Sequence, residues 1–102
     1  MSYRLNITTI NRVWITFDRT KRDKTLKARG LDFRRAREVF STLQLTRLDD
    51  RREYGEQRFI TAGRLDDRMV VIVWTPRGRA RRIISMRKAN EREIKALAPH
   101  LA

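Results

Sequence analysis

Six consecutive apolar residues, Met-Val-Val-Ile-Val-Trp at positions 69–74, constrain the fold more than any other segment. Successive side chains of a strand point to opposite faces of a sheet, so this run is apolar on both faces. It therefore predicts a central strand that is covered on each side. Segments 58–64 and 81–88 flank it, connected through Leu65-Asp66-Asp67 and Thr75-Pro76-Arg77-Gly78. Such short connections predict antiparallel neighbours, because parallel pairs need a longer crossover.

The first half of the chain predicts one strand and two helices. Residues 13–17 are rich in β-branched and aromatic side chains, which favours a first strand. Asp18 is placed to cap a cation-rich helix that ends at Gly30, the residue suited to a left-handed conformation. Asp32 is placed to cap a second helix, and the spacing of its apolar residues gives one stripe that would dock on a sheet: Phe33, Ala36, Val39 and Phe40.

The second half adds a strand, a loop and a final helix. Residues 43–48 alternate in polarity and predict a strand, whereas the polar run 49–56 predicts a loop. Asn90 and Glu93 approximate a capping box, so we expect a last helix with Ile94, Leu97 and Leu101 on its apolar face, unless Pro99 ends it early. The predicted fold is α+β, an antiparallel sheet of about four strands with two helices before the meander and one C-terminal helix.

The length of 102 residues suits a single domain spanning 1–102. Residues 1–12 have no clear period, and we expect either a leader or an extra edge strand there. The N-terminus lacks the apolar core of a signal peptide, and the run 69–74 is too short to cross a bilayer. These features indicate a cytoplasmic protein with no membrane partner.

Charge is the main compositional clue to function. The chain has 25 Lys and Arg against 12 Asp and Glu, a net charge of +13. Such an excess attracts polyanions in a salt-dependent manner, so nucleic acid and an acidic protein partner both fit. Cysteine is absent and His100 is the only histidine, which argues against a metal centre and against a Ser–His or Cys–His nucleophile. We therefore expect no metal and no cofactor.

The segment 80–89, Ala-Arg-Arg-Ile-Ile-Ser-Met-Arg-Lys-Ala, is a cationic strand that directly precedes the capped last helix. Regular alternation places Arg81, Ile83, Ser85 and Arg87 on one side, and Arg82, Ile84, Met86 and Lys88 on the other. A guanidinium is not buried without a partner. We therefore expect this strand to be anchored in the core while its charged ends contact a polyanion.

RNA cleavage through the ribose 2′-hydroxyl needs a base, cations that stabilise the phosphorane, and an acid for the leaving 5′-oxygen. Arginine and lysine can supply the cations without a metal. If the substrate is RNA, we expect the catalytic group to be Glu56, Arg58, Arg82 and Arg87, and the RNA-binding group to be Lys21, Lys24, Arg29 and Lys88. Glu56 would either accept a proton or orient an arginine, with Tyr54 and Tyr3 as the next candidate acceptors. Most of the other acids in loops 49–56 and 65–67 are expected to be solvated.

Six short motifs follow one another along the chain: Phe17-Asp18-Arg19-Thr20-Lys21, Arg29-Gly30-Leu31-Asp32-Phe33, Glu38-Val39-Phe40, Gly55-Glu56-Gln57-Arg58, Thr75-Pro76-Arg77-Gly78 after the apolar run, and Arg82-Ile83-Ile84-Ser85-Met86-Arg87-Lys88-Ala89. Through these motifs residues 15–95 resemble the BrnT-type toxins of bacterial toxin–antitoxin pairs, whose fold is similar to that of the RelE superfamily of ribonucleases. The family usually has Trp where this chain has Phe17, and His where it has Arg29. A guanidinium stays protonated, so Arg29 cannot replace a histidine in proton transfer.

The resemblance implies a cytoplasmic, metal-independent ribonuclease that inhibits translation. It implies neutralisation by a cognate BrnA-like ribbon-helix-helix antitoxin, with operator DNA contacted only through the toxin–antitoxin complex. Two other classes stay open at this point. One is a non-catalytic nucleic-acid-binding domain, which the loss of the histidine would permit, and the other is a regulatory module that acts only through a protein partner.

Overall fold

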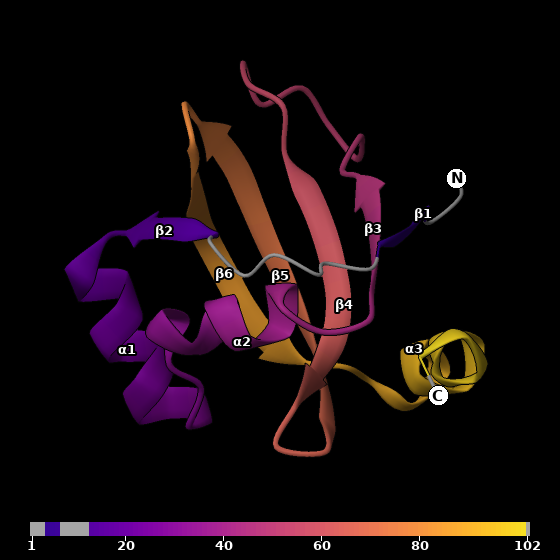
Figure 1. Cartoon of the computed structure of the whole chain (residues 1–102). Helices are drawn as coiled ribbons and strands as arrows, with labels where there is room; N and C mark the ends of the chain where they lie inside the picture. The colour runs from indigo at the N-terminus through magenta and orange to yellow at the C-terminus, as the bar shows by residue number, and fades with distance from the viewer. Residues whose placement is uncertain (1–3, 7–12, 102) are drawn as a thin grey trace.

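The computed structural model describes residues 4–6 and 13–101. Within these residues one six-stranded sheet has the order β1-β3-β4-β5-β6-β2 (Figure 1). Its strands are β1 (Arg4–Asn6), β2 (Trp14–Phe17), β3 (Gln44–Leu48), β4 (Phe59–Leu65), β5 (Arg68–Arg77) and β6 (Ala80–Lys88). The helices are α1 (Arg19–Arg29), α2 (Ala36–Phe40) and α3 (Glu91–Leu97), with 3₁₀ turns at Phe33–Arg35 and Ala98–His100.

The α+β class and the antiparallel meander are confirmed, but the prediction of about four strands in an antiparallel sheet is wrong in two respects. In the described part of the chain, two short strands, β1 and β2, extend the sheet at its edges. The pairing of β2 with β6 is parallel, which makes the sheet mixed. Short turns impose the antiparallel pairing of β4, β5 and β6, whereas the long connection between β2 and β6 imposes no such direction.

The N-terminal segment agrees with one of its two predicted forms. Residues 4–6 pair with β3 as an edge strand, while 1–3 and 7–12 lie outside the described residues. The leader alternative stays a prediction for those positions.

The predicted boundaries of α1 are confirmed. The Asp18 carboxylate accepts a hydrogen bond of 3.1 Å from the backbone N–H of Lys21, and Gly30 ends the helix with φ at 70°. None of its side chains is buried. This helix therefore offers mostly charged side chains to solvent.

The first side of the sheet is covered by α2 and the 3₁₀ turn before it (Figure 1). All four residues of the predicted stripe, Phe33, Ala36, Val39 and Phe40, are buried against β5 and β6. At Gly63 in β4 an added Cβ would lie 2.6 Å from Val39 Cγ1, so the absence of a side chain allows α2 to approach the sheet. We call this side the helix face.

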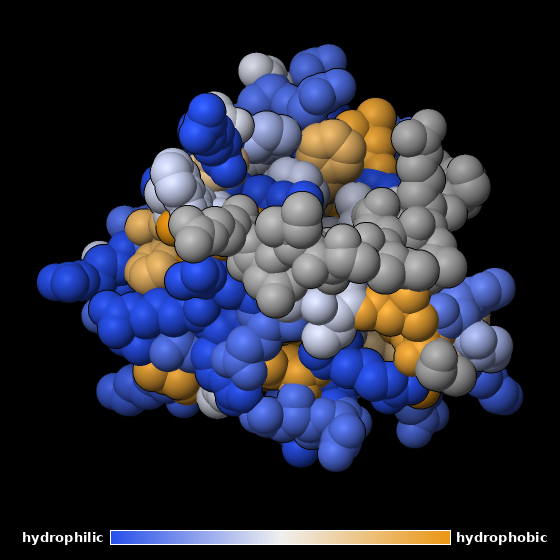
Figure 2. Space-filling model, viewed as in Figure 1, coloured by the Kyte–Doolittle hydropathy of each residue, from blue (hydrophilic) through white to orange (hydrophobic). Residues whose placement is uncertain are grey.

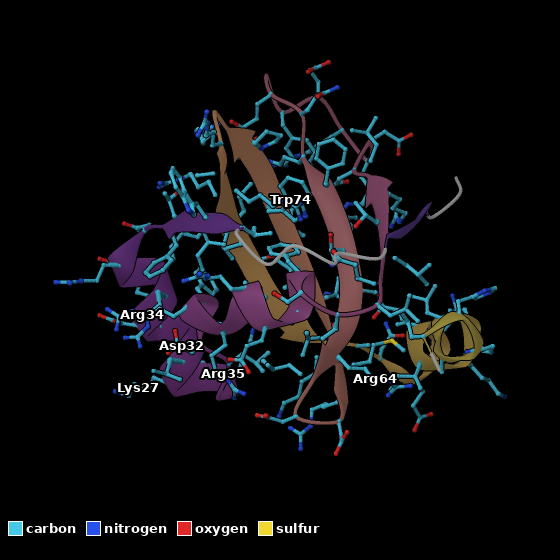
Figure 3. All side chains as sticks on the ribbon, viewed as in Figure 1. Lys27, Asp32, Arg34, Arg35, Arg64 and Trp74 are labelled. Atoms are coloured by element: carbon cyan, nitrogen blue, oxygen red, sulfur yellow. The ribbon has the colours of Figure 1, made fainter. Side chains whose placement is uncertain are left out.

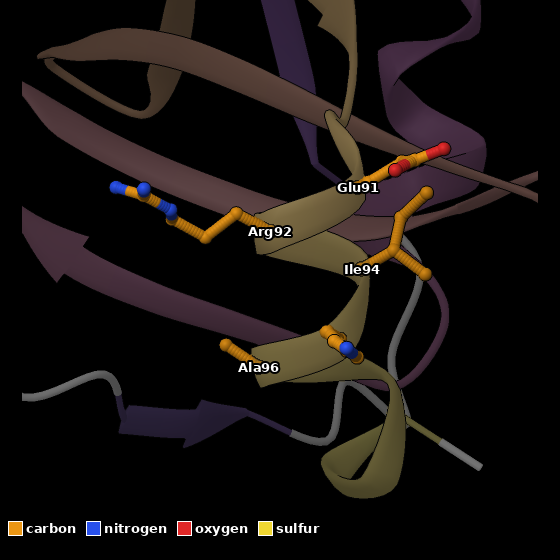
Figure 4. A pocket seen from close by; sticks show the side chains of 5 residues that line it. Glu91, Arg92, Ile94 and Ala96 are labelled. Atoms are coloured by element: carbon orange, nitrogen blue, oxygen red, sulfur yellow. The ribbon is translucent and has the colours of Figure 1, made fainter.

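Among the described residues, α3 covers one end of the opposite side, and the loop between β3 and β4 lies over part of the rest, where the Thr75 hydroxyl donates to the Gln57 carbonyl. Leu97 and Leu101 pack at the α3 end against Leu45, Ala62 and Met69. The capping box of Asn90 and Glu93 is confirmed. The prediction for Ile94 is wrong, because its side chain is 43% exposed and lines a shallow hollow on the outer surface of α3 with Glu91, Arg92, Lys95 and Ala96 (Figure 4). Only the C-terminal end of this short helix reaches the sheet.

A register shift interrupts β6. Trp74 pairs with Ile83 and Val73 pairs with Ser85, so Ile84 is an additional residue on β6. A bulge of this kind reverses the side to which the following residues point. The prediction of regular alternation through 81–88 is therefore wrong after Ile83, and Ile83 and Met86 both lie in the core beneath the helices.

The β5–β6 turn is also tighter than predicted. The strand β5 runs through Pro76 to Arg77, and residues 78 and 79 alone separate it from β6.

The visible surface is mainly hydrophilic, with apolar residues in small groups (Figure 2).

Candidate functional site

The register of β5 and β6 identifies the residues on the uncovered side of the sheet. Val71 is opposite Arg87, Val73 opposite Ser85 and Thr75 opposite Arg82. Residues that pair across strands point to the same side, and this side is opposite the one that carries the core residues Ile72 and Met86. We call the part of it that α3 leaves uncovered the open face. The bulge therefore brings Arg82 and Arg87 to one side, where regular alternation would separate them.

A pocket lies on the open face where the loop after β3 approaches β5 and β6. It is lined by Arg51, Arg52, Tyr54, Arg58, Val73, Ile84 and Ser85. The Arg58 guanidinium carbon lies 4.2 Å from the centre of the Tyr54 ring, a cation–π contact. The pocket thus combines an apolar floor, a hydroxyl and cations.

Glu56 is held by two arginines at the edge of this pocket. Its carboxylate accepts from Arg58 Nε and from Arg77 Nη2, each at 3.1 Å. The hydrogen bond from Arg58, followed by that from Arg77, lowers the pKa of Glu56 below its usual value. A carboxylate in this setting is a weak proton acceptor and a strong orienting group for the two guanidiniums.

Arg87 is paired with α3. Its Nη1 and Nη2 donate to the two carboxylate oxygens of Glu93, at 2.7 and 2.8 Å. This pair lowers the pKa of Glu93, and the charge of Arg47 on β3 contributes in the same direction. The guanidinium of Arg87 is therefore oriented from the side where α3 covers the sheet.

Asp49 departs from the expectation that most acids of the loop 49–56 are solvated. It lies at the end of β3 and is 4% exposed. Its carboxylate accepts two side-chain hydrogen bonds from Arg51, at 2.7 and 2.8 Å, and one from the Tyr54 hydroxyl at 3.1 Å. These contacts, led by Arg51, lower the pKa of Asp49 to about 2. The hydrogen bond to Asp49 thus fixes the Tyr54 ring, and the Arg58 guanidinium packs against the face of that ring.

The expected RNA-binding residues lie apart from this group. Lys21 and Lys24 are exposed on α1, and Lys88 pairs with the core residue Val70, which puts it on the helix face. Arg29 Nη1 donates a hydrogen bond of 2.9 Å to the backbone carbonyl of Met86. The structure therefore brings the four expected catalytic residues to the open face and places the four expected RNA-binding residues elsewhere.

The cations around α1 also serve the fold. Arg22 on α1 forms two hydrogen bonds with the carboxylate of Asp32, at 2.9 and 2.7 Å, and these connect α1 to the turn that precedes α2. Arg35 pairs with Glu38 and with Asp66 of the β4–β5 turn. Lys27, Asp32, Arg34 and Arg35 gather around this region in Figure 3.

Arg81 shows how the helix face accommodates a cation. Its guanidinium carbon lies 4.3 Å from the Trp74 ring centre and 4.6 Å from that of Phe40. Burial lowers the pKa of Arg81. The partner that a buried guanidinium requires is here a pair of aromatic rings rather than a carboxylate.

Within residues 13–101, no group of three or more His, Asp or Glu side chains is arranged to hold a metal ion. None of the helices described above has the length and apolar character needed to span a membrane.

Comparison with known families gives one match. Residues 17–93 match the family described as the ribonuclease toxin, BrnT, of type II toxin–antitoxin systems. No curated protein matches the chain. The matched range includes α1, the loop after β3 and all of β4 to β6, and it ends at Glu93.

Proposed function

The chain belongs to the BrnT family of ribonuclease toxins of type II toxin–antitoxin systems, and on that premise we propose that it cleaves RNA without a metal ion at the open face. The observation that carries the proposal is the bulge at Ile84, because it puts Arg82 and Arg87 on the same side of the sheet as the pocket lined by Arg58. Three guanidiniums on the side of the sheet that carries this pocket suit an RNA phosphate whose negative charge grows during cleavage.

In the proposed reaction the ribose 2′-oxygen bonds to phosphorus and the bond from phosphorus to the 5′-oxygen breaks. Arg82 and Arg87 stabilise the charge on the phosphorane, and Arg58 holds the phosphate at the pocket. Glu56 orients Arg58 and Arg77, since its lowered pKa makes it a poor proton acceptor. The proton of the 2′-hydroxyl leaves to solvent, and the Tyr54 hydroxyl, which lies at the same pocket, gives a proton to the leaving 5′-oxygen and is then reprotonated from solvent.

In this proposal the cations of α1 and of the helix face bind RNA. Lys21, Lys24, Arg29 and Lys88 contact phosphates of the RNA chain that flank the cleavage position. Their contribution is electrostatic, so it weakens as salt concentration rises. The separation of these cations from the open face is consistent with a strand that passes around the edge of the sheet at β6.

The family implies a cognate antitoxin as well as RNA. We propose that this antitoxin is BrnA-like, with a ribbon-helix-helix DNA-binding part, and that the chain contacts operator DNA only in its company. An acidic antitoxin segment would fit the arginines of the open face. We also propose that residues 1–102 act as one domain in the cytoplasm and that RNA cleavage inhibits translation.

Expression with and without the neighbouring gene, which we expect to encode the antitoxin, tests the proposal. Induction of the chain alone should arrest growth and degrade RNA, and co-expression of the antitoxin gene should relieve both effects. Arg82→Ala should lower the cleavage rate of purified protein by about a hundredfold or more, because one preorganised charge donor is lost. Arg37→Ala, at an exposed position of α2, is the matched control and should cleave like the parent.

A non-catalytic binding domain is the alternative class. Harmless expression with intact RNA, together with RNA binding by the purified chain, would contradict the ribonuclease proposal and support this class.

A further inference from the structure

Trp14 is the large apolar side chain that the fold leaves most open to solvent among those described, with 55% of its surface exposed. It lies on the edge strand β2, three positions before the matched family range begins. Neighbouring Ile15 and Phe17 pack against the core of the helix face. Alternation along β2 therefore directs Trp14 and Thr16 to the opposite side of the sheet.

The register of β2 on β6 places Trp14 beside the proposed catalytic arginines. Thr16 is opposite Arg82 and Trp14 is opposite Ala80, in a parallel pair. Residues in register share a side, and Arg82 lies on the open face, so Trp14 lies on that face as well. A strand spacing of about 4.8 Å and a rise of about 3.3 Å per residue put the Cα atoms of Trp14 and Arg82 roughly 8 Å apart.

We propose that Trp14 is a stacking platform for a nucleobase of the RNA substrate, the one adjacent to the phosphate held by Arg82. This inference rests on the proposed function. An indole beside a guanidinium matches a nucleotide, because the ring accepts the base while the cation pairs with the phosphate. The net charge of +13 favours such a polyanion over an apolar partner for the same surface.

Because the second tryptophan, Trp74, is buried, tryptophan fluorescence can test the proposal. Trp74 is 7% exposed, and its Nε1 donates a hydrogen bond of 2.8 Å to the Thr61 hydroxyl. Its side chain belongs to the core of the helix face, and Figure 3 labels it over the middle of the sheet. A ligand that stacks on protein from solution therefore reaches Trp14 and leaves Trp74 unaffected, so changes in tryptophan emission report on Trp14.

The experiment uses the full chain and a single-stranded 2′-O-methyl RNA, which lacks the attacking hydroxyl and is not cleaved. Titration should quench the accessible part of the tryptophan emission. Trp14→Ala should remove this quenching and weaken RNA affinity between about fivefold and about a hundredfold. Trp14→Phe should keep most of the affinity. Ile94→Ala, an exposed apolar position on α3, is the matched control and should bind like the parent.

Cleavage kinetics on natural RNA separate this role from a structural one. Loss of stacking should raise KM while kcat changes by less than about twofold, because the ring contacts bound substrate before and during the reaction. Equal affinity and equal KM in the parent and Trp14→Ala would overturn the stacking role even if both cleave RNA. If the parent neither binds nor cleaves RNA, the proposed function itself fails, and the stacking role falls with it. Loss of antitoxin binding in Trp14→Ala with unchanged RNA affinity would assign the surface to the protein partner instead.

Discussion

Glu93 holds Arg87 through two parallel hydrogen bonds of 2.7 and 2.8 Å while the same carboxylate caps α3 by accepting from the backbone N–H of Asn90 at 2.9 Å. One side chain thus connects the start of the last helix to a cation of the open face. The two-pronged geometry fixes the plane of the guanidinium as well as its position.

Glu93→Gln tests this connection. Glutamine keeps the capping hydrogen bond but loses the charged pair, so we expect the cleavage rate to fall about tenfold while stability falls by less than about 1 kcal/mol. Arg87→Ala alone should cost about a hundredfold. Rates and urea denaturation of both single variants and the double variant are the measurements. The double variant should cleave no more slowly than Arg87→Ala, and losses that multiply would show that Glu93 acts independently.

Glu56→Gln separates proton transfer from orientation. If Glu56 orients Arg58 and Arg77, the amide should lower the rate moderately without moving the acid limb of the pH–rate profile. Arg58→Ala should then cost more than Glu56→Gln, because it removes the group that contacts phosphate. Profiles between pH 4 and pH 9 decide the matter. Disappearance of the acid limb in Glu56→Gln would identify the carboxylate as the base.

The α1 lysines should contribute to RNA binding through charge alone. In the Lys21→Ala, Lys24→Ala double variant the slope of log affinity against log salt should decrease by roughly 0.7 for each lost phosphate contact with single-stranded RNA. The control is the double variant Arg92→Ala, Lys95→Ala on α3, which removes the same charge from another exposed helix. Identical slopes in the two double variants would mean that α1 does not contact RNA.

Local signals in the sequence predict much of this fold. Asp18 and Gly30 mark the ends of α1, Asn90 and Glu93 form the predicted capping box, and the run 69–74 is the central strand between β4 and β6. Each of these features depends on neighbours within a few residues. That is why the residues alone are sufficient to predict them.

Features that depend on distant contacts were not predictable in the same way. The bulge at Ile84 is set by how β6 meets β5, and nothing in the segment 81–88 reveals which residue is additional. The burial of Asp49 depends on Arg51 and Tyr54 folding back over it. The Asp-x-Arg spacing was the available signal, but such spacing is common in solvated loops. The candidate site therefore needed the structure, although its four residues were named from sequence.

Arg29 lies where the resemblance to the BrnT-type toxins leads us to expect histidine. Its guanidinium donates to the Met86 carbonyl on β6, so we expect Arg29 to support the fold as well as to contact phosphate as proposed above, and not to transfer a proton. Arg29→His should lower stability by about 1 kcal/mol and leave the shape of the pH–rate profile unchanged. Thermal melting and single-turnover rates between pH 5 and pH 8 provide the comparison. A new inflection near the imidazole pKa of about 6.5, with a higher rate, would show instead that this position transfers a proton.

Acid stability should depend on Asp49. Its pKa is about 2 in the folded chain, against an ordinary value of 3.8. A lowered pKa stabilises the fold above the unfolded value, so the contribution of about 2 kcal/mol is complete above pH 5 and is lost as pH falls from about 4 to 2. Urea denaturation across this range should give a steeper decline for the parent than for Asp49→Asn, which cannot titrate. Asp50→Asn, at the exposed neighbouring position, should keep the steep decline of the parent. Equal slopes in the parent and Asp49→Asn would mean that other carboxylates, such as those paired with Arg22 and Arg87, carry the acid sensitivity.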